Sequence, residues 1–330
     1  MKVTLFRRRP YIGCFSVERV FEGICTAFPK TLNVRTNISR FQSRGFFPRV
    51  MNVLEAAFNQ GEVNHVAGDV HYLTLGLSGK KTLLTVLDCV TLEKSRGPRW
   101  WGLYLFWYWL PIRRAGLISV ISESTRRELL KYVPCPPDKV RVVPCPCPER
   151  MQPVARQFRG ERPVILQIGT AQNKNLDRVV EALADIPCEF RIIGRISTTT
   201  KRLLDEFKIS HTNKFDLSDE EIAREYEQCD LVIFASTYEG FGMPIIEAQA
   251  VGRPVITSNI LSMPEVAGDA ACLVDPFDVQ DIRAGILKVI ESDSYRRELV
   301  TLGFENVERF RADRIAAQYM ELYEELKRAA

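Results

Sequence analysis

The sequence Ser236-Thr-Tyr-Glu-Gly-Phe-Gly-Met-Pro-Ile-Ile-Glu-Ala-Gln-Ala250 lies between two short apolar runs, 231–235 and 255–257. This order predicts a buried strand, a glycine loop, a short helix and a second strand. Pro244 suits the first turn of the helix, where its missing N–H is not needed. Gly252 suits the residue that ends the helix, because glycine adopts the left-handed backbone without strain. The stretch therefore predicts one repeat of a parallel α/β sheet.

The loop in this stretch has the features of a ligand site. Gly240 and Gly242 let a ligand approach the backbone without a side chain in the way. The helix behind the loop attracts anions, because its first N–H groups and its dipole point toward the ligand. Glu239 and Glu247 flank this helix start, and a carboxylate can accept hydrogen bonds from two hydroxyl groups of a sugar or a ribose. The alternative is a strand–loop–helix junction with two solvated glutamates.

The nine residues from Glu239 to Glu247 resemble a family signature. They are similar to the Glu-x7-Glu motif of retaining, nucleotide-sugar-dependent glycosyltransferases of family 4, also called glycosyl transferases group 1. The resemblance implies the GT-B fold, an α/β architecture of two Rossmann-like, doubly wound domains that face each other across a cleft. It also implies that Glu239 contacts the donor sugar and Glu247 the ribose. The loop backbone that would lie against the sugar and diphosphate comprises Gly240, Phe241, Gly242 and Met243.

Length and composition exclude several classes of protein. The chain has 330 residues, 46% of them hydrophobic, which is enough for two domains with sizeable cores. A net charge of +4 does not suggest a dedicated nucleic-acid binder. Residues 1–10 lack the apolar core of a signal peptide, and no apolar run approaches the ~20 residues that cross a bilayer. The nine cysteines show no CxxC spacing, so we expect reduced thiols, no metal site and a cytoplasmic location.

The second half of the chain alternates between strand and helix patterns. Such alternation predicts a parallel, doubly wound sheet with ligands at the carboxyl ends of its strands. Chemically interesting loops follow three of these strands. In the family that the chain resembles, the nucleotide base lies at Phe215 and Asp216, a position that does not separate uracil from guanine. The three loops are 169–175, 215–216 and 236–243.

The loop Gly169-Thr-Ala-Gln-Asn-Lys-Asn175 has neither a P-loop nor a dinucleotide fingerprint. It resembles the family's glycine-to-Lys-Asn loop, which implies that Gly169 and Lys174 lie against the donor diphosphate. A lysine acts there as a point charge on the leaving group. Many relatives carry an arginine there as a second positive charge beside the lysine, whereas this chain has Thr170. The residue that would supply this second charge is unknown, with Arg195 as a candidate. The alternative is that Lys174 is a solvated loop lysine.

Candidate acceptor-side residues lie in the first half of the chain. Gly13 falls in the loop after the first strand, where the family is usually richer in glycine. Asp88 ends the strand pattern 82–88 and is a candidate catalytic residue. Related enzymes often have a histidine directly before this aspartate, and the chain has leucine there. His71 is a candidate to approach the same cleft, although a single histidine is more often structural.

The segment Trp100-Trp-Gly-Leu-Tyr-Leu-Phe-Trp-Tyr-Trp-Leu110 is unusually aromatic, and Arg113 and Arg114 follow it. One interpretation is a helix buried in the first domain. The other is a peripheral membrane contact through residues 100–114, on the inner face of the membrane that carries the acceptor. Aromatic rings flanked by cations suit the headgroup level of a bilayer, so both interpretations stay open.

The domain boundary is marked by proline. Eight of the eighteen prolines lie between 134 and 163, and such a run breaks helices and central strands. We expect residues 1–150 to form the acceptor domain, completed by a C-terminal helix at 314–330. Residues 151–313 are expected to form the donor domain.

Together these features predict a retaining hexosyltransferase of polysaccharide biosynthesis. It would move a sugar from a UDP- or GDP-sugar to a glycan or lipid-linked acceptor, with no cofactor besides its donor. No Asp-x-Asp occurs in the chain, so a metal-bound diphosphate is not indicated, and Lys174 would stabilise the leaving group instead. Two alternatives remain. One is an epimerase or phosphorylase of the same fold, and the other is a non-catalytic subunit that binds a partner glycosyltransferase.

Overall fold

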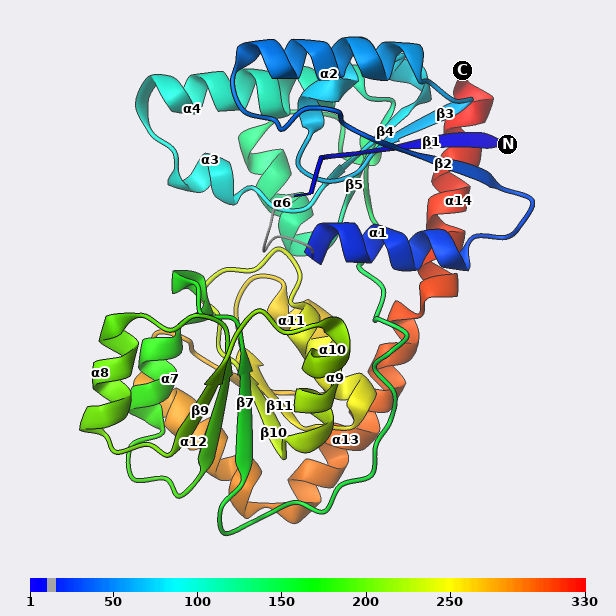
Figure 1. Ribbon diagram of the computed structural model, residues 1–330. Helices are drawn as coiled ribbons and strands as arrows, with labels where there is room; N and C mark the ends of the chain where they lie inside the picture. The colour runs from blue at the N-terminus through cyan, green and yellow to red at the C-terminus, as the bar shows by residue number, and fades with distance from the viewer. Residues whose placement is uncertain (11–15) are drawn as a thin grey trace. The chain divides into compact units, whose positions relative to one another are not determined.

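The computed structural model describes residues 1–10 and 16–330 (Figure 1). The chain divides into two compact units. Unit 1 comprises Met1–Pro146 and Ala312–Ala330, and unit 2 comprises Cys147–Arg311. Each unit is built on a six-stranded parallel sheet with helices packed on it. The expected α/β fold of two doubly wound, Rossmann-like domains is therefore confirmed.

The sheet of unit 2 reverses its direction of winding at one place. Its strand order is β12-β11-β10-β7-β8-β9, so the chain adds β8 and β9 on one side of β7 and then returns to place β10 on the other. The carboxyl ends of β7 and β10 therefore flank a topological switch point, where open α/β sheets bind ligands. The strands are β7 (Val164–Ile168), β8 (Glu189–Ile193), β9 (His211–Lys214), β10 (Leu231–Phe234), β11 (Val255–Ser258) and β12 (Cys272–Val274).

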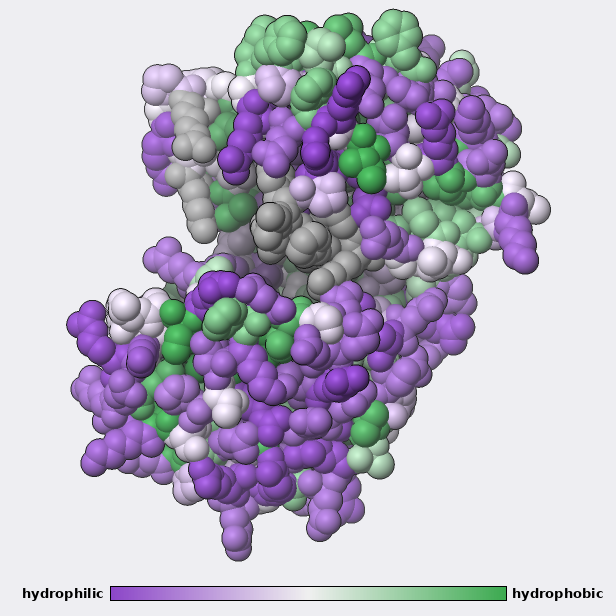
Figure 2. All heavy atoms as spheres, in the orientation of Figure 1, coloured by the Kyte–Doolittle hydropathy of each residue, from purple (hydrophilic) through white to green (hydrophobic). Residues whose placement is uncertain are grey.

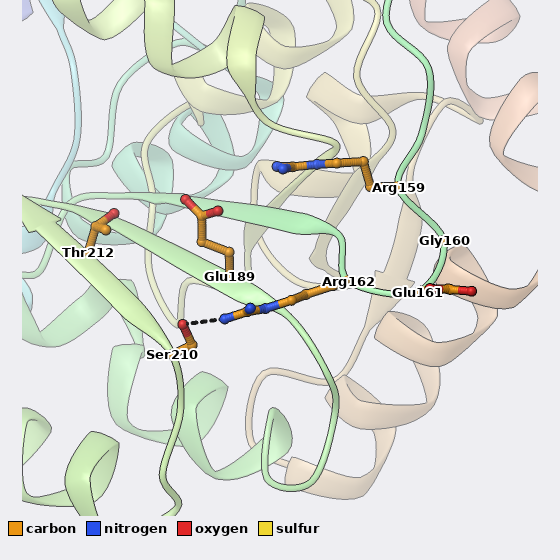
Figure 3. A pocket seen from close by; sticks show the side chains of 7 residues that line it. All are labelled: Arg159, Gly160, Glu161, Arg162, Glu189, Ser210 and Thr212. Carbon is orange, nitrogen blue, oxygen red and sulfur yellow. Dashed lines mark hydrogen bonds between the residues drawn. The ribbon is translucent and has the colours of Figure 1, made fainter.

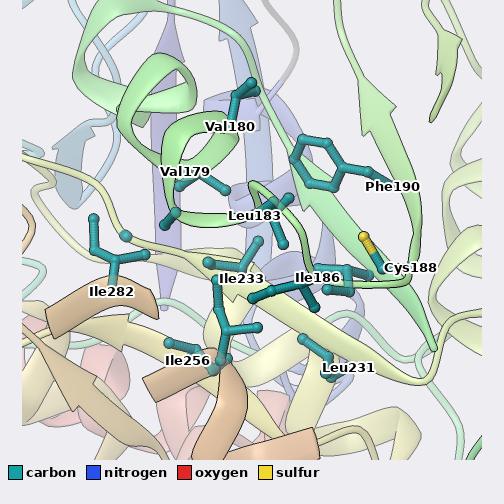
Figure 4. Close-up of a cluster of buried hydrophobic side chains, with 14 of the residues drawn as sticks. Val179, Val180, Leu183, Ile186, Cys188, Phe190, Leu231, Ile233, Ile256 and Ile282 are labelled. Atoms are coloured by element: carbon teal, nitrogen blue, oxygen red, sulfur yellow. The ribbon is translucent and has the colours of Figure 1, made fainter. Parts of the chain in front are cut away.

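Helices cover both faces of this sheet. Its central strands are continuous apolar runs because both of their faces are buried, and Figure 4 shows side chains of β8, β10 and β11 packing with those of α7 and α12. The α-helices are α7 (Leu176–Ala182), α8 (Thr198–Glu206), α9 (Asp219–Gln228), α10 (Met243–Val251), α11 (Met263–Ala267), α12 (Val279–Glu291) and α13 (Asp293–Val307). Two 3-10 helices are η5 (Gln172–Lys174) and η6 (Glu308–Phe310).

The sheet of unit 1 has the strand order β2-β1-β3-β4-β5-β6, also entirely parallel among the described residues. Its switch point lies between β1 and β3, so the loops after these two strands are the ones expected to meet a ligand. The strands are β1 (Lys2–Arg7), β2 (Asn33–Ile38), β3 (Val63–Val66), β4 (Thr82–Val86), β5 (Leu117–Val120) and β6 (Val140–Val142).

Unit 1 has one hydrophobic cluster on each face of its sheet. On one face, the C-terminal helix packs beside α1, and on the other face α6 and the aromatic segment cover β4 and β5. The α-helices are α1 (Ser16–Ala27), α2 (Phe46–Phe58), α3 (Val90–Lys94), α4 (Gly97–Leu103), α5 (Leu110–Arg114), α6 (Glu123–Tyr132) and α14 (Ala312–Ala329). The 3-10 helices are η1 (His71–Gly76), η2 (Gly79–Lys81) and η4 (Pro137–Lys139).

A buried histidine ties the C-terminal helix to the sheet. His65 on β3 is fully buried, with Nδ1 2.8 Å from the Tyr323 hydroxyl of α14 and Nε2 2.7 Å from the Thr85 hydroxyl of β4. Burial lowers the pKa of His65 to about 3, so the ring is neutral at physiological pH. This network holds α14 in unit 1, although α14 is separated from the rest of the unit by the whole of unit 2 in the sequence.

The aromatic run is partly buried and partly exposed. It continues from α4 through a π-helix, η3 (Tyr104–Trp109), into α5. Tyr108 is buried, and the Trp100 ring stacks on Tyr104 with 5.0 Å between ring centroids. Trp101 and Phe106, in contrast, are 66% and 52% exposed. Most of the rings thus serve the core of unit 1, while these two reach its surface.

Candidate active site

Lys174 and Glu239 form an ion pair at the switch point of unit 2. Lys174 ends the 3-10 turn that follows β7, and Glu239 lies in the loop that follows β10. The Lys174 Nζ and Glu239 Oε1 atoms are 2.6 Å apart. The two side chains are 21% and 15% exposed, so solvent reaches them while the surrounding loops fix their positions. The pair therefore occupies the edge of the sheet that ligands of this architecture use.

Asn173 connects the same two loops. Its Nδ2 donates to the Tyr238 carbonyl at 2.9 Å and to Glu239 Oε1 at 3.2 Å. Its own carbonyl accepts the Thr237 N–H at 2.8 Å. Asn173 was not among the residues that the sequence pointed to, although it directly precedes Lys174. These bonds preorganise the loops, so a ligand at Lys174 would meet a carboxylate already in place.

Two glycines in the loops of this pair have backbone angles that a larger residue would strain. Gly169 and Gly242 have φ angles of +91° and +116°, a left-handed backbone that favours glycine. A Cβ atom on Gly169 would lie 3.0 Å from Cε of Lys174, so a larger residue there would push the lysine. Gly169 therefore sets the position of Lys174, in addition to any contact with a ligand.

Within the loop from Glu239 to Met243, the Phe241 side chain turns into the core of unit 2. Phe241 is buried and packs edge-on against Phe310, with 5.6 Å between ring centroids. The Ser262 hydroxyl lies 2.9 Å from the Glu239 carbonyl and 2.8 Å from the Phe241 carbonyl, and no sequence pattern had indicated this serine. Helix α10 starts directly after the loop, with Pro244 in its first turn. Its N-terminal dipole makes this end suited to an anion such as a diphosphate.

Helix α10 leaves one face out of the core. Seven of its nine residues are buried, and the two exceptions are Met243 and Glu247. These residues are four positions apart and lie on the same face of the helix. The Tyr226 hydroxyl donates to Glu247 Oε2 at 2.7 Å, and burial together with this carboxylate raises the pKa of Tyr226 well above its ordinary value. Burial and the same carboxylate raise the pKa of the Cys147 thiol to about 12, so Cys147 remains protonated.

Phe215 and Asp216 follow β9 and are joined by Arg195, which follows β8. The Arg195 guanidinium lies 4.1 Å from the centroid of the Phe215 ring and pairs with the Asp216 carboxylate. Its backbone carbonyl accepts the Thr170 hydroxyl at 2.8 Å, which links this cluster to the loop after β7. Phe215 is 46% exposed, so its ring is accessible to a flat ligand such as a nucleobase. Arg195, the candidate second cation, therefore interacts with the residues expected near the base.

The described acceptor-side candidates, His71 and Asp88, lie in unit 1 and differ in how deeply they are buried. His71 is 3% exposed, its Nδ1 lies 2.8 Å from the Trp107 carbonyl, and burial lowers its pKa. Asp88 is half-buried, and its carboxylate accepts the N–H of Val90, the first residue of α3, at 3.1 Å. Tyr108 lies between them, with its ring edge-on to His71 and its hydroxyl donating to the Asp88 carbonyl. Gly13 lies outside the described residues.

A cavity in unit 2 lies at the opposite edge of the sheet from Lys174 and Glu239. It has a volume of about 520 Å³, and Figure 3 shows it at the amino ends of β7, β8 and β9. Arg162 donates to the Ser210 hydroxyl at 2.7 Å, and Arg159 pairs with Asp230 at 3.0 Å. Because parallel α/β sheets bind ligands at the carboxyl edge, this cavity is not the candidate site.

Comparison with protein families places the site in a known domain. Residues 150–304 match the family model of glycosyl transferases group 1. The O-antigen chain mannosyltransferase B of Escherichia coli is 28% identical over 230 residues, which cover 63% of this chain and 60% of that protein. The MMP alpha-(1->4)-mannosyltransferase of Mycolicibacterium hassiacum is 28% identical over 277 residues, covering 76% of this chain and 67% of that protein.

Solved structures extend the comparison to both units. The sucrose-phosphate synthase of Thermosynechococcus elongatus superposes with a TM-score of 0.81 and 17% identity, covering 100% of both chains. Anabaena HepE in complex with UDP and glucose gives a TM-score of 0.79 and 15% identity over 98% of this chain and 100% of that one. In the described part of this chain, none of the helices has the length and apolar character to span a bilayer. The chain has the GT-B fold, and its residues 150–304 are similar to the glycosyl transferases group 1 family.

Proposed function

We propose that this protein is a retaining glycosyltransferase of family 4 that acts in polysaccharide biosynthesis. It transfers a hexose, with mannose as the first candidate, from a UDP- or GDP-sugar to a glycan or lipid-linked acceptor. The observation that carries the proposal is the 2.6 Å contact between Lys174 and Glu239 at the head of α10. The two mannosyltransferase relatives support mannose as the sugar.

Each part of the donor has a matching group in unit 2. The Lys174 ammonium and the N-terminus of α10 attract the diphosphate. The Glu239 carboxylate accepts hydrogen bonds from sugar hydroxyl groups, and Glu247, on the unburied face of α10, accepts them from the ribose. The base stacks at Phe215. On binding, the diphosphate takes the place of Glu239 as the counter-ion of Lys174, which releases Glu239 to the sugar.

The reaction breaks the bond between the anomeric carbon and the diphosphate oxygen. The acceptor hydroxyl oxygen attacks the anomeric carbon from the side that the diphosphate leaves, so the configuration is retained. The proton of that hydroxyl passes to the departing phosphate oxygen, and no protein base is needed. Lys174 and the N–H groups of α10 stabilise the negative charge that develops on the leaving group. Such preorganised charge contributes most where water is excluded.

Transfer is proposed to need no metal ion, because no Asp-x-Asp is present and Lys174 supplies the positive charge. We expect turnover to continue after exhaustive treatment with EDTA. Chelation that abolishes turnover, with recovery on adding Mg²⁺ or Mn²⁺, would show that the charge on the leaving group comes from a metal and that this part of the proposal is wrong.

The function is tested by incubating the protein with a panel of nucleotide sugars that includes GDP-mannose and UDP-glucose, with and without glycan acceptors. We expect acceptor-dependent release of one nucleoside diphosphate and a product with retained configuration.

Lys174→Met should lower the rate of this transfer by about 10²–10³-fold, the scale for removing one preorganised charge-stabilising group. Lys201→Met, on the exposed surface of α8, is the matched control. An altered nucleotide sugar without acceptor would indicate an epimerase, and binding without turnover would indicate a non-catalytic subunit.

A further inference from the structure

Helix α2 of unit 1 exposes an apolar surface. Phe46, Phe47 and Phe58 are 83%, 70% and 88% exposed, although phenylalanine is normally buried. Val50 and Leu54 lie on the same side of the helix, one and two turns along. We call these five residues the α2 patch. Figure 2 shows it as a continuous hydrophobic area over α2, in contrast to the polar surface of unit 2 in the same view.

A groove runs along this patch. Its volume is about 600 Å³, within the range of ligand pockets, and it lies between α2 and the segment 102–107 of the aromatic run. Val53 and Leu54 line one side, and Leu103 and Phe106 line the other. Among its described lining residues, Arg49 is the one that carries a charge. Such a groove offers an apolar chain a place to lie but offers few partners to a polar ligand.

Cations border the α2 patch. Between residues 40 and 58 the sequence has three arginines and one glutamate, a local net charge of +2. The Arg49 guanidinium, which lines the groove, lies 4.8 Å from the centroid of the Trp107 ring, whose Nε1–H donates to the Asp69 carboxylate at 3.2 Å. The glutamate, Glu55, accepts the backbone N–H of Arg40 at 3.1 Å. The border therefore attracts an anionic surface.

We infer that unit 1 binds the surface of an anionic lipid bilayer through the α2 patch, with one lipid hydrocarbon chain in the adjoining groove. A helix with phenylalanines on its outer face and arginines beside it is suited to the boundary between headgroups and acyl chains. A second copy of the chain fits less well, because two identical cationic borders would face each other across a two-fold interface. The inference concerns where the protein is held and does not depend on the reaction in unit 2.

This assignment differs from the sequence-based membrane hypothesis. The aromatic run 100–110 contributes Gly102, Leu103, Phe106 and Trp107 to the lining of the groove, but most of its rings pack within unit 1. The proposed contact adds α2, which lies outside the segment 100–114. Only the folded chain brings the two segments together.

Co-sedimentation with vesicles tests the inference. Wild-type protein should bind vesicles of phosphatidylglycerol and phosphatidylcholine, and binding should weaken with added salt and on vesicles of phosphatidylcholine alone. Phe46→Ser/Phe58→Ser should weaken binding by about a hundredfold or more, since each exposed ring that enters the bilayer contributes about tenfold or more. Phe277→Ser, which removes a 59% exposed phenylalanine from unit 2, is the matched control and should bind as wild type does. Circular dichroism verifies that each variant is folded.

The groove is tested separately by Gly102→Leu. Gly102 lines the groove, and a Cβ atom placed on it would contact nothing within 4 Å, so a side chain can be introduced there. Leucine also adds apolar area. If a lipid chain occupies the groove, Gly102→Leu weakens vesicle binding in spite of that added area. Binding equal to or tighter than that of wild type would overturn the assignment of the chain to the groove.

Three results would overturn the membrane assignment. The first is wild-type protein that stays in the supernatant with anionic vesicles. The second is a folded Phe46→Ser/Phe58→Ser variant that binds as tightly as wild type. The third is self-association in sedimentation velocity that the double variant abolishes while vesicles have no effect, which would make the α2 patch an interface between two copies of the chain.

Discussion

At the scale of single residues, the sequence indicated both residues of the ion pair in the candidate site but did not indicate that they are in contact. Glu239 and Lys174 were each predicted from the resemblance of their loops to those of a known family. They are 65 positions apart, however, and they meet because β10 lies beside β7. That adjacency is decided by how the sheet is wound, which local patterns do not specify. Asn173, which joins the two loops, was missed because a loop asparagine has no distinctive signal.

Glu247→Ala is expected to weaken the binding of the nucleotide sugar by about 1–3 kcal/mol, the scale for losing hydrogen bonds to a charged group. Isothermal titration calorimetry with UDP- and GDP-sugars measures the change. Tyr226→Phe is the control, because it removes the hydroxyl that donates to Glu247 and keeps the buried ring. If Glu247 touches the donor, the alanine variant loses affinity and the phenylalanine variant retains most of it. Equal affinities in wild type and Glu247→Ala would remove Glu247 from the site.

His65 should make the stability of unit 1 depend on pH. Its pKa is about 3 in the folded chain and 6.5 in an ordinary environment, so below pH 6.5 the unfolded chain takes up a proton that the folded chain does not. The free energy of unfolding therefore falls with decreasing pH, by about 1.4 kcal/mol per unit from this residue. Urea unfolding at pH 7 and at pH 5 should show the stability advantage of wild type over His65→Gln narrowing as the pH falls. Parallel pH profiles would contradict the assignment.

At the scale of elements, helix α10 was the best predicted. Pro244 was expected in its first turn and Gly252 at its end, and the structure has both, with α10 spanning Met243–Val251 and Gly252 as its C-cap. The reason is that proline and glycine act through the backbone, so their effects are local. The face of α10 that carries Glu247 could not be predicted in this way, because the helix is apolar all round and lacks an amphipathic stripe.

Gly252→Ala is expected to lower the stability of unit 2 by about 1–2 kcal/mol, the cost of a left-handed backbone for a residue with a Cβ atom. Its φ angle is +78°, and the added Cβ would also lie 2.8 Å from Cζ of Phe304. Gly160→Ala is the matched control, because a Cβ there contacts nothing within 4 Å. Chemical denaturation of both variants provides the comparison. A Gly252→Ala protein as stable as the control would show that the C-cap is not strained.

The aromatic run was harder to interpret at this scale. Its sequence correctly indicated a helical segment, but an unbroken series of large rings does not show which of them face the sheet. The structure divides them, with Tyr108 buried and Trp101 exposed, and inserts a π-helix between α4 and α5. The exposed face of α2 was missed for a related reason, since its phenylalanines look like core residues until the neighbouring elements are in place.

At the scale of the whole molecule, the alternation of strand and helix patterns predicted the parallel α/β architecture, and the fold comparisons agree with it. The strand order was not available from the sequence, because each strand carries the same apolar signal. The order is nevertheless what creates the site, since β7 and β10 become neighbours only through the reversal of winding. Lys174 and Glu239, which this reversal brings together, are proposed to bind different parts of one donor.

The most direct test compares the affinity for a nucleoside diphosphate with that for the matching nucleotide sugar, by calorimetry, using GDP with GDP-mannose and UDP with UDP-glucose. Lys174→Met should weaken the binding of both ligands by about tenfold or more, because the lysine contacts the diphosphate that they share. Glu239→Gln should lower the affinity for the nucleotide sugar alone. The affinity for the nucleoside diphosphate should stay the same or rise, because Lys174 loses the carboxylate that competes for it. A nucleoside diphosphate that binds Lys174→Met as well as it binds wild type would contradict the account.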